Sequence, residues 1–235
     1  MVANPVLVAL DVPTSDEAFG LASLLKEHVG GFKVGLELLM GPGPDTVRRI
    51  AEFGLPIFCD VKLHDIPNTV RNASRQLGAL GARWITVHSS GGEAQLEAAV
   101  EGLSAGAGGR LAGVLGVTVL TSLSAHDLEQ IGVGDGTENQ VERLTRLTAA
   151  AGAEGVICSP VDLPIVTAAG PGLLKVTPGI RPTGVGVDDH ARPATPDAAI
   201  AAGADYLVVG RAITLAADPV AAASDIVRSI QIQRG

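Results

Sequence analysis

A chain of 235 residues, 46% of them hydrophobic and only 3% of them aromatic, can bury a full core of small aliphatic side chains. Its formal net charge of −8 argues against nucleic acid or an anionic membrane surface as a partner, because both require a basic surface. The N-terminus shows no signal peptide, and no apolar run approaches the roughly 18 residues that span a bilayer. The two cysteines, Cys59 and Cys158, lie in apolar runs typical of buried free thiols, so we expect a cytoplasmic protein.

Eight short apolar runs recur along the chain, and each is followed by a segment with helical character. The predicted strands are residues 5–10, 32–36, 57–61, 84–88, 111–119, 155–158, 173–177 and 206–209. The predicted helices lie between residues 14 and 30, over 45–53, 66–80, 93–103, 125–131, 139–151 and 161–169, from 195, and from 210 to about 232. Strands that alternate with helices form a parallel sheet, and eight such units favour a closed barrel over an open doubly wound sheet. We therefore predict an α/β fold, a (β/α)8 TIM barrel that forms a single domain over residues 1–235.

Charged residues interrupt the otherwise apolar third strand. Asp60 and Lys62 are two residues apart, so their side chains should lie on the same face of the strand, and Asp65 follows just beyond it. Lys33 interrupts the second strand in the same way. An internal ion pair would explain such charges, but barrel active sites lie at the C-terminal ends of the strands. The residues that fall at or near such ends are Asp11, Lys33, Asp60, Lys62, His88, Thr121 and Arg211. Their shared position favours an active site, although for His88 alone a structural role is equally compatible with the sequence.

The charges around Lys62 indicate what chemistry this site supports. A lysine flanked by carboxylates keeps its proton, which disfavours a Schiff base and favours proton donation to negative charge developing on carbon. Crowded carboxylates would also oppose a substrate carboxylate and encourage its loss as carbon dioxide. Asp60 and Asp65 could instead ligate Mg²⁺, but Lys62 competes electrostatically for the same position. We therefore favour a site without a metal ion.

A second group of residues is typical of a phosphate site. Gly179 and Arg181 follow the seventh strand, and Gly210 and Arg211 follow the eighth, where barrels commonly bind phosphate. Glycine lets backbone N–H groups approach an anion, and arginine supplies a fork of donors. The glycines could instead be turn residues, and Arg181 could pair with an aspartate of the long irregular segment at residues 183–196, which is itself a functional candidate.

Seven segments of the chain resemble the orotidine 5′-phosphate decarboxylase family. They occur in the family's order from about residue 6 to the end, and the block at residues 60–69 is the most specific of them. The segments are residues 9–11, 32–35, 60–69, 86–88, 117–122, 176–182 and 209–211.

The resemblance implies a (β/α)8 barrel that converts orotidine 5′-phosphate to UMP in de novo pyrimidine synthesis, without metal or organic cofactor. It implies that Lys62 donates a proton to C6 of the pyrimidine, and that Asp60 and Lys33 belong to the same charge network. It also implies a homodimer with shared active sites, in which Asp65 and Thr69 reach across the interface to the partner's site.

The resemblance further assigns ligand contacts. The ribose hydroxyls would bind Asp11 and Lys33, the pyrimidine ring would lie by Thr121, and the phosphate would bind Arg181, Gly210 and Arg211. Where the family has a glutamine that links the base side of the ligand to its phosphate, this chain has His190. Histidine can donate one hydrogen bond but lacks the donor–acceptor pair of an amide, so the loop clamp differs here.

Two alternatives remain open from the sequence. Related barrels that act on sugar phosphates through Mg²⁺, such as keto-gulonate phosphate decarboxylase and hexulose phosphate synthase, share the spacing of Asp60, Lys62 and Asp65. They lack the continuation found here at residues 66–69. The other alternative, suggested by His190, is a nucleotide-binding protein that has lost catalysis.

Overall fold

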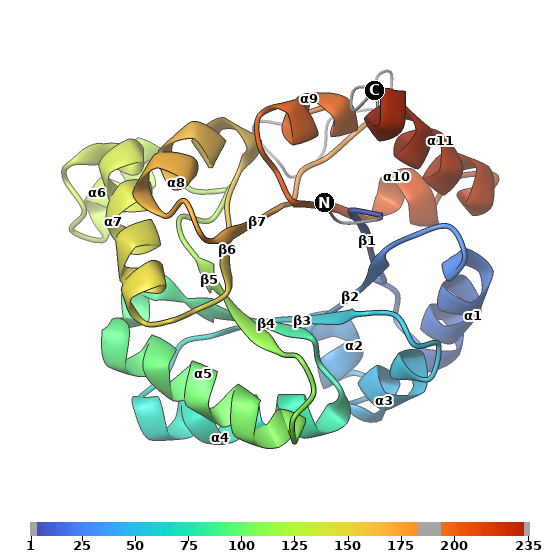
Figure 1. The fold of residues 1–235 in the computed structure, drawn as a ribbon, viewed down its shortest axis with the longest axis horizontal. Coiled ribbons are helices and arrows are strands. Elements are labelled where there is room, and N and C mark those ends of the chain that lie inside the picture. Colours follow the sequence, from blue (N-terminus) through green and yellow to red (C-terminus); the bar gives the residue numbers. More distant parts are fainter. Residues whose placement is uncertain (1–3, 183–193, 233–235) are drawn as a thin grey trace.

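The computed structural model describes residues 4–182 and 194–232 and shows a closed barrel of eight parallel strands (Figure 1). Each strand pairs with the next in the chain, and the last pairs with the first. The strands are β1 (Val6–Ala9), β2 (Gly31–Gly35), β3 (Ile57–Leu63), β4 (Trp84–His88), β5 (Gly113–Val117), β6 (Gly155–Ile157), β7 (Leu174–Thr177) and β8 (Tyr206–Val209). The predicted TIM barrel is therefore confirmed.

The helices form a ring outside the strands (Figure 1). They are α1 (Ser15–Leu25), α2 (Leu36–Met40), α3 (Asp45–Ala51), α4 (Pro67–Leu80), α5 (Glu93–Ala107), α6 (Ala125–Gln130), α7 (Gly136–Ala150), α8 (Leu163–Ala169), α9 (Pro196–Ala201), α10 (Arg211–Thr214) and α11 (Pro219–Ile232). Local signals in the sequence set several of their ends. The Thr14 hydroxyl caps α1 by accepting the N–H of Glu17, and α4 ends at Gly81, whose φ of 103° is readily adopted only by glycine.

Three predicted segments differ from the observed elements. Leu36 was expected to end the second strand, but it begins the short helix α2. The predicted helix over residues 210–232 is two helices, α10 and α11, because Pro219 lacks an N–H and starts a new helix. The fifth strand covers only Gly113–Val117 of the predicted residues 111–119.

The core has two layers that together position the site. The larger layer lies between the strands and the helices, and the smaller one fills the barrel itself. The inner layer consists of Leu7, Ala9, Phe58, Trp84, Leu115, Val176 and Val208. Trp84 packs edge-on against Tyr206 in this layer, with ring centroids 4.9 Å apart. These apolar side chains close the barrel interior below the polar residues at the C-terminal ends of the strands.

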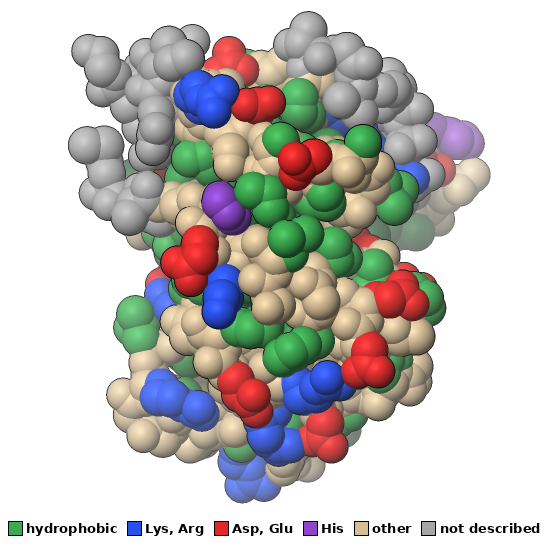
Figure 2. All heavy atoms as spheres, turned by 90° about the vertical axis from the view of Figure 1, so that its right-hand side faces the viewer, with side chains coloured by type: hydrophobic (Ala, Val, Ile, Leu, Met, Phe, Trp, Pro, Cys, Tyr) green, Lys and Arg blue, Asp and Glu red, His purple; other side chains and the backbone are tan. Residues whose placement is uncertain are grey.

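The outer surface carries interspersed charges. Figure 2 shows the side of the barrel to which α1 and α11 contribute, where acidic, basic and hydrophobic side chains are mixed. Ion pairs compensate charge locally, such as Arg49 of α3 with Asp16 of α1, and Arg228 with Asp225 within α11. Exposed pairs of this kind contribute about 0–1 kcal/mol each, so the fold does not depend on them. Within the described ranges, no helix has both the length and the apolar character needed to cross a membrane.

Helices α4 and α5 approach each other closely because glycines face the contact. A Cβ atom at Gly102 would lie 2.1 Å from the carbonyl oxygen of Arg71, and one at Gly106 would lie 2.0 Å from that of Arg75. A Cβ at Gly78 would lie 2.6 Å from the Leu103 oxygen. No real side chain tolerates these distances, so a substitution forces the backbones apart. The glycines therefore set the distance between α4 and α5.

We predict that Gly102→Ala lowers the free energy of unfolding by about 1–3 kcal/mol, because the new methyl group overpacks the contact between α4 and α5. The matched control is Gly20→Ala in α1, where nothing lies within 4 Å of the added methyl group. Gly20→Ala should stabilise by about 0.4–1 kcal/mol, since it reduces the entropy of the unfolded chain. Urea unfolding of both variants measures the difference. Equal effects of the two substitutions would contradict the account of the packing.

Candidate active site

A cavity of about 470 Å³ opens at the C-terminal ends of the strands. Its volume is in the range typical of small-molecule sites. The predicted site residues that line it are Asp11, Lys33, Asp60, Lys62, Thr121, Arg181, Gly210 and Arg211. Asp65 and Thr69 are exposed and do not line it, and His190 lies outside the described residues. The fold therefore brings together eight of the predicted residues from six of the eight strands or the loops that follow them.

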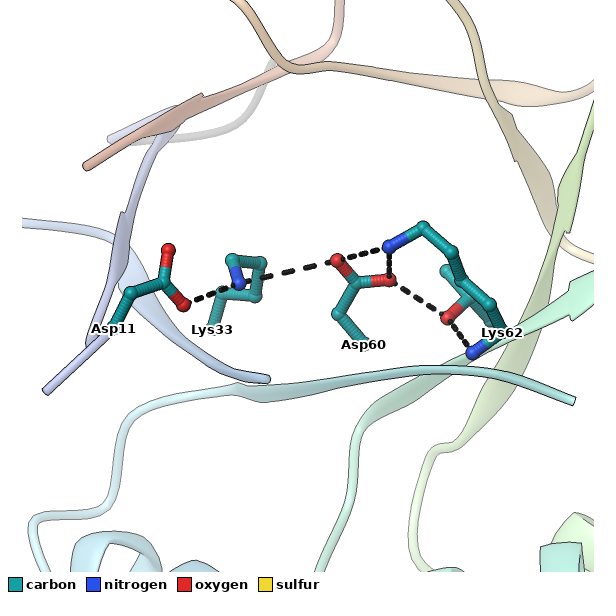
Figure 3. A network of polar contacts seen from close by, with 5 residues as sticks. Asp11, Lys33, Asp60 and Lys62 are labelled. Atoms are coloured by element: carbon teal, nitrogen blue, oxygen red, sulfur yellow. Dashed lines mark hydrogen bonds and ion pairs between the residues drawn. The ribbon is translucent and has the colours of Figure 1, made fainter. Parts of the chain in front are cut away.

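Four charged side chains form a continuous network across one side of the cavity (Figure 3). The Lys33 ammonium lies 2.9 Å from Asp11 Oδ1 and 3.9 Å from Asp60 Oδ2. The Lys62 ammonium donates to both oxygens of Asp60 at 2.7 Å. Acidic and basic groups thus alternate in the order Asp11, Lys33, Asp60, Lys62, so that each charge has an opposite neighbour.

The network becomes more exposed from its centre to its ends. The side chains of Lys33 and Asp60 are only 10% and 16% exposed, whereas those of Lys62 and Asp11 are 32% and 53% exposed. Buried charges require such pairing, because an unpaired one would cost several kcal/mol. Gly35 leaves the necessary space, since a Cβ there would lie 3.0 Å from Lys33 Nζ and 3.1 Å from Asp11 Oδ1. The role of Gly35 was not predicted, because spacing in the sequence does not reveal which side chains a glycine faces.

The backbone that carries Lys62 departs from regular strand geometry. Asp60 and Lys62 lie side by side as predicted, but Lys62 has φ of 47°, in the left-handed region. The register shifts here, because Cys59 to Leu63 of β3 lie opposite only Ile85 to Val87 of β4. A left-handed conformation costs a residue with a side chain about 1–2 kcal/mol. The prediction of a simple strand was therefore wrong about how Lys62 reaches the cavity.

Thr86 of β4 holds this irregular segment. Its buried hydroxyl accepts the backbone N–H of Lys62 at 2.9 Å and donates to Asp60 Oδ1, also at 2.9 Å. Both charged residues of the pair are thus bonded to one side chain from the neighbouring strand. Thr86 lies in a segment that resembles the family, but no role was predicted for it, because this contact depends on the register between two strands.

The two histidines near the network lie outside the cavity lining. The ring of His88, at the end of β4, lies 5.4 Å from that of His64. Burial, followed by the nearby His64 and Lys62, lowers the pKa of His88, while Asp60 acts in the opposite direction. This lower pKa favours the uncharged form of His88. The buried Gln95 donates to the His88 carbonyl and accepts the backbone N–H of Asp65, which anchors the loop after β3.

The loops after β7 and β8 form another part of the cavity wall. Gly179 has φ of 77°, which requires glycine, and is followed by Arg181, whose backbone N–H donates to the Ala194 carbonyl. Gly210 precedes α10, and its carbonyl accepts the backbone N–H groups of the third and fourth residues that follow. Two arginines and two glycines thus line the same cavity as the charge network, which suits a ligand that carries an anion at one end.

Apolar side chains complete the cavity. Phe58, Val117, Ile157, Cys158 and Val208 line it between the charged regions. Burial raises the pKa of Cys158 to about 12, and that of Cys59 likewise to about 12. Both cysteines are buried and free, as predicted, so neither is a nucleophile at neutral pH. The cavity therefore has an apolar part between its charged regions.

Candidate metal ligands do not gather in this region. Among residues 4–182 and 194–232, no three His, Cys, Asp or Glu side chains converge as a metal ion would require. Both oxygens of Asp60 are already occupied by the Lys62 ammonium.

Comparison with known proteins agrees with this geometry. A family model described as "Orotidine 5′-phosphate decarboxylase / HUMPS family" matches residues 4–226. A protein of Anaeromyxobacter sp. (strain K), named orotidine 5′-phosphate decarboxylase, is 50% identical over 222 residues, covering 94% of this chain and 96% of that protein. The protein of the same name from Halorhodospira halophila (strain DSM 244 / SL1) is 46% identical over 226 residues, covering 96% of this chain and 95% of its own.

A solved structure is also similar over nearly its whole length. The crystal structure of orotidine 5′-phosphate decarboxylase from Lactobacillus acidophilus has a TM-score of 0.86 and 39% sequence identity, covering 97% of this chain and 99% of that chain. The family model covers most of the sequence, and the two relatives cover 94% and 96% of it. The chain belongs to the orotidine 5′-phosphate decarboxylase / HUMPS family.

Proposed function

We propose that this protein decarboxylates orotidine 5′-phosphate to UMP in de novo pyrimidine biosynthesis, without a metal ion or organic cofactor. The observation that carries the proposal is the alternating network of Asp11, Lys33, Asp60 and Lys62 in a cavity that also contains Arg181 and Arg211. The names of the similar proteins support the same substrate. We place the reaction in the cytoplasm, where free buried cysteines stay reduced.

In this proposal Asp60 and Lys62 carry out the chemistry. The substrate carboxylate lies near Asp60, whose negative charge opposes it and favours its departure. The bond between C6 and the carboxyl carbon breaks, carbon dioxide leaves, and the electron pair remains on C6. The Lys62 ammonium then gives its proton to C6 and becomes neutral. The Lys62 side chain is more exposed than that of Asp60, so its ammonium is accessible to a substrate in the cavity.

The remaining cavity residues bind the rest of the substrate. Asp11 and Lys33 bind the ribose hydroxyls, Thr121 lies by the pyrimidine ring, and Arg181, Gly210 and Arg211 hold the phosphate. His190 would take the place of the family's glutamine in the loop clamp. Binding energy from a phosphate remote from C6 can position the reacting carboxylate against Asp60, which raises the rate and not only the affinity.

The contacts of Asp60 favour this reaction over Mg²⁺-dependent chemistry on a sugar phosphate. An ammonium donates to both oxygens of Asp60 at 2.7 Å, so a metal ion would first have to displace Lys62. Asp65 does not line the cavity of its own chain, and the other carboxylate there, Asp11, is paired with Lys33 at 2.9 Å.

Mixing the purified protein with orotidine 5′-phosphate tests the function, with conversion to UMP followed by absorbance. We expect turnover that EDTA leaves unchanged, and a rate about 10²–10⁴-fold lower for Lys62→Ala, which lacks the proton donor. Loss of turnover in EDTA that Mg²⁺ restores would instead indicate the sugar-phosphate class. UMP binding without turnover would indicate a nucleotide-binding protein with a silenced site.

The phosphate contact can be tested separately. We predict that Arg211→Ala lowers kcat/KM for orotidine 5′-phosphate by about 100-fold, because a charge-assisted contact is lost. The same variant should leave kcat/KM for orotidine, which has no phosphate, within about twofold of the unmodified protein. Arg228→Ala, on the exposed face of α11, is the control and should change neither value. An equal loss with both substrates would show that Arg211 does not act through the phosphate.

We also propose a homodimer in which Asp65 and Thr69 complete the partner's site. Both residues are exposed and lie outside the cavity of their own chain. Large apolar side chains are exposed in the neighbouring segments after β2 and β3, with Met40 77% and Ile66 66% accessible. Contact with a second copy would bury these side chains together with the two polar residues.

A mixture of two inactive variants tests this sharing. Lys62→Ala and Asp65→Ala should each be nearly inactive, because each homodimer has the same defect in both sites. When the variants are co-expressed, a mixed dimer has one site with both residues intact, so about a quarter of full activity should return. Activity that stays at the level of the separate variants would show that Lys62 and Asp65 act within one chain.

A further inference from the structure

The backbone conformation of Lys62 requires an explanation. Within residues 4–182 and 194–232, Lys62 is the only residue other than glycine with a positive φ. It lies inside a strand, where such a conformation interrupts the ladder of backbone hydrogen bonds. Strained residues persist only where surrounding contacts hold them, and they occur preferentially at functional sites. The contact that holds Lys62 should therefore matter for its position.

Thr86 supplies that contact. It is fully buried on β4, between the two residues that mark the register shift, and its hydroxyl accepts the Lys62 N–H at 2.9 Å. The same hydroxyl donates its hydrogen to Asp60 Oδ1 at 2.9 Å. Asp60 in turn accepts from the Lys62 ammonium. The contacts close a ring from the backbone of Lys62 through Thr86 and Asp60 to the end of the Lys62 side chain.

We propose that Thr86 is a positioning residue that sets where the Lys62 ammonium lies in the cavity. A hydroxyl can accept one hydrogen bond and donate another, and this one uses both capacities on the two residues of the ion pair. The side chain is also β-branched, which restricts the rotation that would move the hydroxyl. Thr86 thus holds the backbone of Lys62, and it also holds the Asp60 carboxylate that accepts hydrogen bonds from the Lys62 ammonium.

The consequence for turnover rests on the proposed function. The ammonium must approach C6 closely as charge develops there, and small displacements of a reacting group lower rates strongly. The residues proposed to bind the phosphate and the ribose come from other strands, and the hydroxyl of Thr86 bonds to Lys62 and Asp60 instead. Loss of the hydroxyl should therefore reduce kcat while leaving substrate binding nearly intact.

The test compares Thr86→Val, which keeps the shape and removes the hydroxyl, with Thr86→Ser, which keeps the hydroxyl. We expect Thr86→Val to lower kcat for orotidine 5′-phosphate by about 10- to 100-fold and to change KM by less than about threefold. Thr86→Ser should remain within about threefold of the unmodified protein in both values. The control is Thr145→Val in α7, another buried threonine, whose hydroxyl donates to the Val141 carbonyl far from the cavity. It should leave kcat unchanged.

Hydrogen exchange of the Lys62 amide, measured by NMR, gives a readout that does not depend on activity. In Thr86→Val this amide has lost its acceptor, so it should exchange at least about tenfold faster than in the unmodified protein and in Thr145→Val. Thr86→Ala provides the same comparison if the valine variant does not fold. An unmodified protein without turnover would refute the proposed function, and the exchange rates would still decide the positioning role. Unchanged exchange at Lys62, or an unchanged kcat in Thr86→Val of an active enzyme, would overturn the role of Thr86.

Discussion

The ion pair between Asp60 and Lys62 is the interaction on which the site depends. The two 2.7 Å contacts hold an ammonium and a carboxylate together in the wall of the cavity. Neither charge would be stable there alone, because the desolvation of an unpaired buried charge costs several kcal/mol. Lys33 and Asp11 extend the pairing until it reaches the more exposed rim. The network is therefore a single unit, in which removing one member leaves another uncompensated.

In the barrel, the residues that form the apolar core are largely separate from those that form the charge network. The inner apolar layer around Phe58 and Trp84 fills the barrel below the network, and the outer layer attaches the helices. The C-terminal ends of the strands carry the polar groups. The pairing of β2 with β3 and of β3 with β4 places these groups beside one another. Asp60 is opposite Gly35 of β2 in the sheet, and this glycine leaves room for the Lys33 ammonium. Positions on rigid strands give such a network more precision than loops would.

The sequence predicted the features that follow from local patterns. Alternating apolar runs and helical segments were sufficient for the barrel, and two-residue spacing was sufficient to place Asp60 beside Lys62. The family resemblance extended this to residues expected to contact a ligand, and six of these line the cavity: Asp11, Lys33, Thr121, Arg181, Gly210 and Arg211.

Features that depend on contacts between distant segments could not be predicted. The left-handed conformation of Lys62 and the double contact of Thr86 arise from the register of β4 against β3, which no pattern within either strand reveals. The close approach of α4 and α5 depends in the same way on which glycines face each other. The break before α11 does have a local signal in Pro219, but the apolar pattern continues past it and favoured one long helix.

The central claim is that an ammonium group at position 62 performs the proton transfer, and chemical rescue tests it most directly. Lys62→Cys removes the ammonium, and alkylation of the new thiol with 2-bromoethylamine restores one at nearly the same distance from the backbone. Cys59 and Cys158 should not react, because both are buried and burial raises the pKa of each to about 12. The account predicts that Lys62→Cys is inactive, that 2-bromoethylamine restores turnover of orotidine 5′-phosphate, and that the neutral reagent iodoacetamide does not. Full turnover by the unalkylated variant, or no recovery after complete alkylation of a folded protein with 2-bromoethylamine, would contradict it.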